Sequence, residues 1–140
     1  MQSNPTYVHL IPEQALPQLP FPRSFRVVVV LEAECSAVWR ETVSKWLVDS
    51  GCLYAMTWGE NSTVWDTSID IANIEKFDYK EIPEDHFVMT TWHDSEPLSE
   101  TMWFAKNNAF HPTVELQYTL LAHIADQPAE VRLVHAYTEA

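Results

Sequence analysis

Buried-strand patterns alternate with amphipathic helix patterns along most of this chain, and this alternation constrains the fold more than any other feature. The stretch Phe25–Leu31 is a β-branched run, which is typical of a strand buried on both faces. Residues 36–51 follow, with apolar side chains at helical spacing and a glycine at the end. Further pairs of strand and helix patterns lie at 52–58 and 62–77, at 87–92 and 94–109, and at 117–124 and 128–137.

Four strands that alternate with helices predict a three-layer α/β sandwich around a mainly parallel four-stranded sheet, with a Rossmann-like or flavodoxin-like topology. The last strand has an alternative, because Gln117–Ile124 could instead extend a helix from Pro112; the strand is favoured. Capping preferences place the start of the second helix at Ser62 or Thr63, and that of the third at Asp94 or Ser95.

Proline separates the first part of the chain from the rest. Five of the nine prolines fall within residues 1–24, and proline fixes φ and removes a hydrogen-bond donor. We therefore expect residues 1–24 to form an extended arm that lies on a single α/β domain spanning residues 25–140. The alternative is a disordered leader. Residues 1–22 have neither the basic nor the apolar region of a signal peptide.

Composition excludes several functional classes. The chain has 140 residues with 20 acidic and 8 basic side chains, a net charge of −12. Phosphate backbones and anionic membrane surfaces both require a basic face, so neither nucleic acid nor a membrane is an expected partner. With two glycines, the chain cannot build a glycine-rich phosphate loop. Two cysteines do not make a disulfide framework, and a reducing cytoplasmic setting fits them better.

Between Phe25 and Ala136 the sequence resembles a small bacterial domain family of unknown function. The resemblance rests on the stretches at 27–59 (VVVVLEAECSAVWRETVSKWLVDSGCLYAMTWG), 65–73 (WDTSIDIAN), 82–106 (IPEDHFVMTTWHDSEPLSETMWFAK) and 110–116 (FHPTVEL). It implies a bacterial or phage origin, and it brings no activity, cofactor or catalytic residue with it.

Acidic residues follow several of the predicted strands. Ligands of open parallel sheets bind beyond the carboxyl ends of the strands, and Mg²⁺ or Mn²⁺ prefers carboxylate oxygens. Glu32, Asp94 and Glu96 are therefore candidate metal ligands, with His93 as a candidate catalytic group that transfers a proton or contacts a phosphate. The layout is similar to toprim-type metal sites, although Ala33 stands where those sites usually have glycine. Helix capping alone also accounts for Asp94 and for an acidic first turn at Glu96.

Aromatic and acidic residues share the same predicted edge of the sheet. Acids and indole rings both attract cations, so this combination suggests a surface that recognises a cationic group. The candidate binding residues are Trp58, Glu60, Trp65, Asp66, Asp70 and Trp92. For the three tryptophans of this set, a place in the core between helix and sheet is an equally good expectation. The three remaining tryptophans, Trp39, Trp46 and Trp103, sit at core-facing helical positions and are expected to fill the interior.

The absence of a complete catalytic motif in the sequence favours a protein-binding module, of immunity, inhibitor or accessory type, that engages a basic partner and needs no cofactor. The eleven acidic residues between Glu60 and Glu100, against two lysines, suit such a partner, although solubility alone also accounts for them. The alternative is a divalent-metal enzyme that acts on a phosphate-containing substrate through Glu32, Asp94 and Glu96. A third possibility is a catalytically silent domain that dimerises through exposed aromatic side chains.

Overall fold

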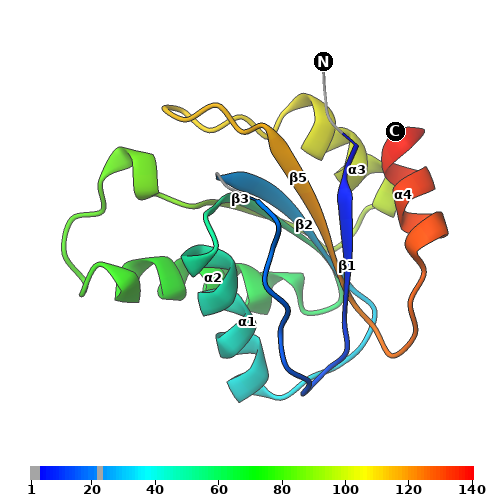
Figure 1. Cartoon of the computed structure of the whole chain (residues 1–140), viewed down its shortest axis with the longest axis horizontal. Helices are drawn as coiled ribbons and strands as arrows, with labels where there is room; N and C mark the ends of the chain where they lie inside the picture. The colour runs from blue at the N-terminus through cyan, green and yellow to red at the C-terminus, as the bar shows by residue number, and fades with distance from the viewer. Residues whose placement is uncertain (1–3, 22–23) are drawn as a thin grey trace.

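A computed structural model describes residues 4–21 and 24–140, and within them five strands form one wholly parallel sheet in the order β1-β5-β2-β3-β4 (Figure 1). The strands are β1 (Thr6–Leu10), β2 (Phe25–Leu31), β3 (Cys52–Gly59), β4 (Met89–His93) and β5 (Tyr118–Ile124). The helices are α1 (Ala37–Asp49), α2 (Ser62–Lys76), α3 (Leu98–Asn107), α4 (Glu130–Thr138) and a short 3₁₀ turn, η1 (Glu84–His86).

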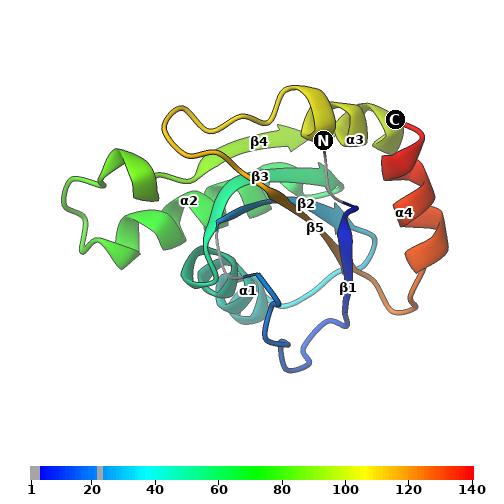
Figure 2. The ribbon, with the colours of Figure 1, turned by 45° about the horizontal axis from the view of Figure 1, so that its top comes forward.

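The two faces of the sheet carry separate hydrophobic cores because successive side chains of a strand point to opposite sides. In β2, Val27 and Val29 pack with residues of α1 and α2, whereas Val28 and Val30 pack with residues of α3 and α4. Figures 1 and 2 show the two helix pairs on opposite faces of the sheet. The three-layer parallel α/β arrangement expected from the sequence is therefore confirmed.

The order of the strands creates a switch point between β2 and β5. From β2 the chain moves outward through β3 to β4, and it then crosses back to place β5 on the other side of β2. The segments that follow β2 and β5 consequently lead to helices on opposite faces of the sheet. In doubly wound sheets, ligands bind at the carboxyl edge near such a point.

The prediction of four strands is wrong, because β1 adds a fifth at the edge of the sheet beside β5. The prolines flank this strand at Pro5 and Pro12 and leave its interior free to pair. The expected Pro-rich arm is not shown: residues 1–3 and 22–23 of it lie outside the described residues, and Thr6–Leu10 belong to the sheet. Beyond β1, the chain is fixed to α1 by indole N–H groups: Trp39 donates to the Gln14 carbonyl and Trp46 to the Pro17 carbonyl, both at 2.9 Å.

Helix boundaries agree with the sequence at α1 and differ at the next two helices. The Ser36 hydroxyl accepts a hydrogen bond from the Trp39 amide at the start of α1, as a capping serine should. The α2 cap is Asn61, so the expectation of Ser62 or Thr63 is wrong by one or two residues. The expectation that Asp94 or Ser95 caps the third helix is also wrong, because α3 begins only after Pro97. The alternative of a long helix through 117–124 is excluded by β5.

Two of the three tryptophans expected in the interior lie at least partly there. Trp39 is buried and Trp46 packs partly buried against the same core, but Trp103 is 50% exposed on α3. In the part of the chain that is described, no helix has both the length and the apolar character needed to cross a membrane.

Candidate binding pocket at the carboxyl edge of the sheet

The strand register places a row of polar and aromatic side chains across the sheet near its carboxyl edge. His123 of β5 is aligned with Val30 of β2 on one side and with His9 of β1 on the other. Val30 is in turn aligned with Trp58 of β3, and Trp58 with His93 of β4. Because paired residues point to the same face, the row lies on the side of α3 and α4.

His123 is the centre of a hydrogen-bonded network at the switch point. It is 1% exposed, and its Nε2 lies 2.6 Å from Oε1 of Glu32, the residue that follows β2. Its Nδ1 lies 2.7 Å from the Tyr7 hydroxyl, which also accepts a hydrogen bond from the Ala129 amide at 3.0 Å. Arg132 of α4 donates to the same Glu32 oxygen at 2.6 Å. The network therefore joins β1, β2, β5 and α4 at one point.

These contacts fit a neutral His123. The Tyr7 hydroxyl already accepts from the Ala129 amide, so its own proton is directed to Nδ1, and the proton on Nε2 is directed to Glu32. Burial lowers the pKa of His123, and this effect outweighs the opposing contribution of Glu32. Partial burial would raise the pKa of Glu32, but hydrogen bonds from Arg132 and His123 hold it below its usual value.

A second histidine–glutamate pair lies at the other end of the row. His93 Nδ1 is 3.1 Å from Glu96 Oε1, and its Nε2 is 2.8 Å from the Thr91 hydroxyl. Glu96 is also held by the Thr101 hydroxyl, which donates to Oε2 at 3.0 Å, and by the Trp58 indole, which donates to its carbonyl at 2.8 Å. Glu96 is thus fixed just before α3 begins.

A pocket of about 490 Å³ opens between the two pairs. Its lining consists of Leu31, Glu32, Ala33, Glu34, Trp58, Gly59, Glu60, Asn61, Asp94 and Glu96. Five of these side chains are carboxylates, and none of the described lining residues is basic. The pocket is therefore acidic, and one indole forms part of its wall.

Gly59 is part of the lining of this pocket. Its φ is +111°, and a β-carbon built on it would lie 2.6 Å from the carbonyl oxygen of Leu31. Glycine is therefore required both by the backbone conformation and by the close approach of β3 to β2. One of the two glycines of the chain stands at this position.

The candidate metal ligands Glu32, Asp94 and Glu96 all line this pocket. Among the residues described, no group of three or more His, Cys, Asp and Glu side chains is arranged so that it could hold a metal ion. The candidate catalytic residue His93 is 8% exposed and both of its ring nitrogens are within hydrogen-bonding distance of a protein partner. The metal and catalytic roles stay predictions.

Two of the six candidate binding residues line the pocket, and the other four lie outside its lining. Trp58 and Glu60 line the pocket, and Trp92 is 56% exposed on the neighbouring edge strand β4. Trp65 instead lies in the core against Trp39, with ring centroids 6.5 Å apart. The remaining two, Asp66 and Asp70, lie on α2 beneath β4, where the Thr90 hydroxyl donates to Asp70 at 2.8 Å.

Asp66 is the most unusual of the candidate residues that lie outside the pocket lining. It is 6% exposed, and its Oδ1 has no hydrogen-bond partner among the described residues. Burial and then the nearby Asp70 raise the pKa of this carboxyl above its ordinary value. Asp66 is therefore harder to ionise than an ordinary aspartate side chain.

Sequence reasoning missed Tyr7, His123 and Arg132. A weak signal existed for His123, because a histidine inside the apolar stretch of β5 must have a buried partner. Tyr7 and Arg132 carried no such signal, since their roles depend on how β1 pairs and where α4 lies.

Fold and pocket together define a doubly wound parallel α/β domain with an acidic pocket at the carboxyl edge of its sheet. Residues 5–140 match the family described as a domain of unknown function, DUF7684, and the chain belongs to that family. This confirms the resemblance to a small domain family of unknown function. No curated protein and no solved structure matches the chain.

Proposed function

We propose that this domain is a binding module that takes a cationic group of a basic partner protein, a lysine or arginine side chain, into the acidic pocket. The observation that carries the proposal is the lining itself: five carboxylates and the Trp58 indole surround about 490 Å³ with no basic residue in the described lining. A cation in such a pocket gains Coulombic attraction and contact with an aromatic ring. The net charge of −12 adds long-range attraction for a basic protein.

Anchoring of the pocket carboxylates supports the proposal further. Glu32 is held by His123 and Arg132, and Glu96 by Thr101 and His93. Acceptors that are fixed before binding lose little conformational freedom when a ligand arrives. Glu34 and Glu60 are exposed and form no side-chain hydrogen bond or ion pair within residues 4–21 and 24–140, so they can adjust to a guanidinium or an ammonium group.

A metal-dependent enzyme acting on a phosphate-containing substrate is the second candidate, favoured by the presence of Glu32, Asp94 and Glu96 in one pocket. Two observations make it the weaker reading. These carboxylates are not arranged as a ligand set, and the protein's net negative charge repels a phosphate-containing substrate.

Calorimetric titration with a short lysine- and arginine-rich peptide tests the first candidate. Binding should weaken with added salt, since the Debye length is about 10 Å at 0.1 M. The variants Glu60→Gln and Glu34→Gln should each weaken it more than Glu41→Gln, which removes the same charge from α1. Equal weakening by all three would show that general charge attracts the peptide, and the pocket would have no role.

Thermal unfolding with Mg²⁺ or Mn²⁺ separates the two candidates. An ion bound by the folded protein raises its unfolding temperature by mass action. A rise that disappears in Asp94→Asn would favour the metal enzyme. An unfolding temperature that neither ion changes, together with pocket-dependent peptide binding, would favour the binding module.

A further inference from the structure

Arg26 is a buried cation at the opposite end of the sheet from the acidic pocket. It is 8% exposed and stands near the start of β2, while the pocket lies beyond the end of that strand. The register of β2 against β3 shifts here: Phe25 is aligned with Cys52 but Arg26 with Tyr54, which leaves Leu53 without a partner. Such irregularities re-aim a side chain and are common beside functional sites.

Every hydrogen bond of the Arg26 guanidinium ends on a neutral oxygen. Nε donates to the Ala109 carbonyl at 3.2 Å, Nη1 to the Thr119 hydroxyl at 3.2 Å and Nη2 to the Leu116 carbonyl at 3.1 Å. A guanidinium has five N–H groups, so two remain without a partner among the described residues. Within residues 4–21 and 24–140, no carboxylate forms an ion pair with Arg26. Its charge is thus buried without a counter-ion in the described part of the chain.

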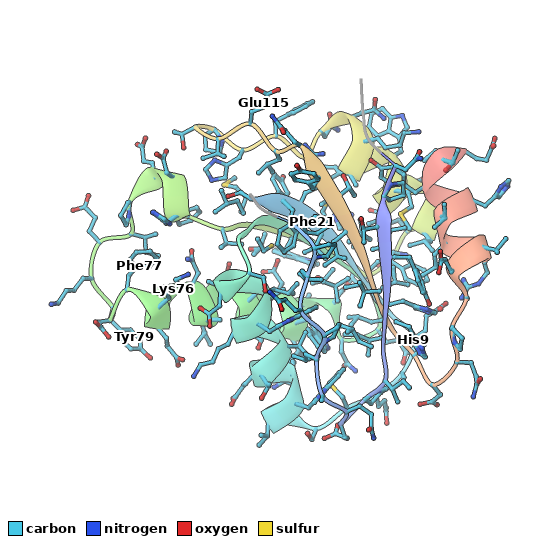
Figure 3. All side chains as sticks on the ribbon, viewed as in Figure 1. His9, Phe21, Lys76, Phe77, Tyr79 and Glu115 are labelled. Atoms are coloured by element: carbon cyan, nitrogen blue, oxygen red, sulfur yellow. The ribbon has the colours of Figure 1, made fainter. Side chains whose placement is uncertain are left out.

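A cavity of about 740 Å³ adjoins this cation. Arg26 lines it together with residues 110–111 and 113–117 of the segment between α3 and β5, and with Tyr118 and Thr119 at the start of β5. Glu115 is the carboxylate among the described lining residues, and Figure 3 shows it at the outer edge of that segment, pointing away from the sheet. This carboxylate is therefore turned away from the sheet, and it forms no ion pair with Arg26.

We propose that Arg26 anchors an oxyanion-binding site in this cavity. A carboxylate or phosphate group of a small molecule occupies the site and accepts hydrogen bonds from the two remaining N–H groups. A planar guanidinium suits such a group because its N–H donors match adjacent oxygens of a carboxylate or phosphate. Two residues that carry hydroxyl groups, Thr113 and Tyr118, are among the lining residues. The site is independent of the acidic pocket.

Desolvation supports the proposal. Burial lowers the pKa of Arg26, which means that its surroundings disfavour the charged form. Guanidinium groups nevertheless stay protonated, so the buried charge calls for an anion. The other role open to Arg26 is purely structural, because its three bonds already hold Ala109 and Leu116 against β2. The experiment has to distinguish these two roles.

Chemical-shift titration of the arginine Nε–H groups distinguishes them directly. Inorganic phosphate and acetate are titrated in parallel to roughly 10 mM, which would largely saturate a site with a Kd of about 1 mM. Sodium chloride at matched ionic strength is the control solution. Arg132, which is paired with Glu32 at the other edge of the sheet, supplies an internal control resonance.

The proposal expects a saturable shift of the Arg26 Nε–H and of the amides at 109–119, with no matching change at Arg132. The anion that acts at the lower concentration shows whether a phosphate or a carboxylate is preferred. Absence of a shift with either anion, a shift that chloride reproduces, or an equal shift at Arg132 would leave Arg26 with a structural role alone.

Two variants make the assignment specific. Arg26→Lys keeps the charge but loses the fork of donors, and binding should weaken roughly tenfold or more. Because that variant also loses contacts to Ala109 and Leu116, Thr113→Phe provides a second test: it fills the cavity from an exposed rim position and leaves Arg26 intact. Unchanged anion affinity in Thr113→Phe would overturn the location of the site.

Discussion

Replacing Glu32 with glutamine tests the network that joins the switch point to the pocket. Glutamine keeps the shape of the side chain but removes the charge that accepts from His123 and Arg132, each at 2.6 Å. A hydrogen bond to a charged group contributes about 1.5–3 kcal/mol and a neutral one about 0.5–1.5 kcal/mol. The loss at the buried His123 is therefore roughly 1 kcal/mol. Arg132 is 54% exposed, and its share is about 0–1 kcal/mol.

We thus expect Glu32→Gln to lower the free energy of unfolding by about 1–2 kcal/mol at pH 7. The effect should depend on pH. The pKa of Glu32 is lowered in the folded state, so its stabilisation is present above the unfolded pKa and disappears as the pH falls through the folded one. Wild type and variant should therefore converge in stability at acidic pH.

Urea unfolding followed by tryptophan fluorescence measures this difference at neutral and acidic pH. The matched control is Glu34→Gln, which removes the same charge from the same pocket but has no hydrogen bond or ion pair among the described residues. Its effect should stay within about 0.5 kcal/mol. If the two variants behave alike at pH 7, or if the Glu32 effect does not change with pH, the assigned network is wrong.

Three further predictions follow from single positions. Gly59→Ala should destabilise the fold by at least about 1–2 kcal/mol, because φ is +111° and the new β-carbon would meet the Leu31 carbonyl oxygen; thermal unfolding measures this, and an unchanged unfolding temperature would contradict it. Asp66→Asn should stabilise the protein by on the order of 1 kcal/mol at neutral pH, because the pKa of Asp66 is raised and wild-type stability falls as the pH rises through that folded pKa. Urea unfolding should show that this gain vanishes at low pH. A variant that is less stable than wild type at pH 7 would refute the prediction. Cys52 should resist thiol reagents in the native state at pH 8, because burial raises its pKa to about 12; mass spectrometry after brief labelling checks this, and rapid modification of native Cys52 would count against it.

The main lines of the fold could be predicted because each element carries its own local pattern. The β-branched stretch of β2 and the capped, glycine-terminated α1 specify themselves within a few residues of the chain. β1 could not be found in this way. It is a short edge strand between prolines, and its position depends on pairing with β5, more than a hundred residues further along the chain.

The candidate site was predictable where it rests on topology alone. Parallel strands bring their carboxyl ends to one edge, and this predicts that Glu32, Trp58, Glu60, Asp94 and Glu96 lie together, as they do in the pocket lining. The hydrogen-bonded network was not predictable, because its contacts join Tyr7 to His123 and Glu32 to Arg132 across 116 and 100 residues of sequence. Which side chains converge over such separations is decided by register and packing.

Trp103 illustrates the limit of helical periodicity. Its spacing is compatible with a core position on α3, yet it is 50% exposed, while its helix neighbours Met102 and Ala105 are buried. A small error in the phase of a short helix is enough to exchange a buried position for an exposed one. The same uncertainty in phase explains why Asp66, expected on an accessible surface, lies in the interior.

Backbone amide and indole shifts during titration with the lysine- and arginine-rich peptide test the central claim most directly. If the acidic pocket binds a cationic group, the Trp58 indole N–H and the amides of Gly59, Glu60 and Asn61 should move together and saturate at one peptide concentration. The amides around Glu41 on α1 should not follow them. Shifts spread over the acidic surface without a maximum at the pocket, or no shift at Trp58, would contradict the account.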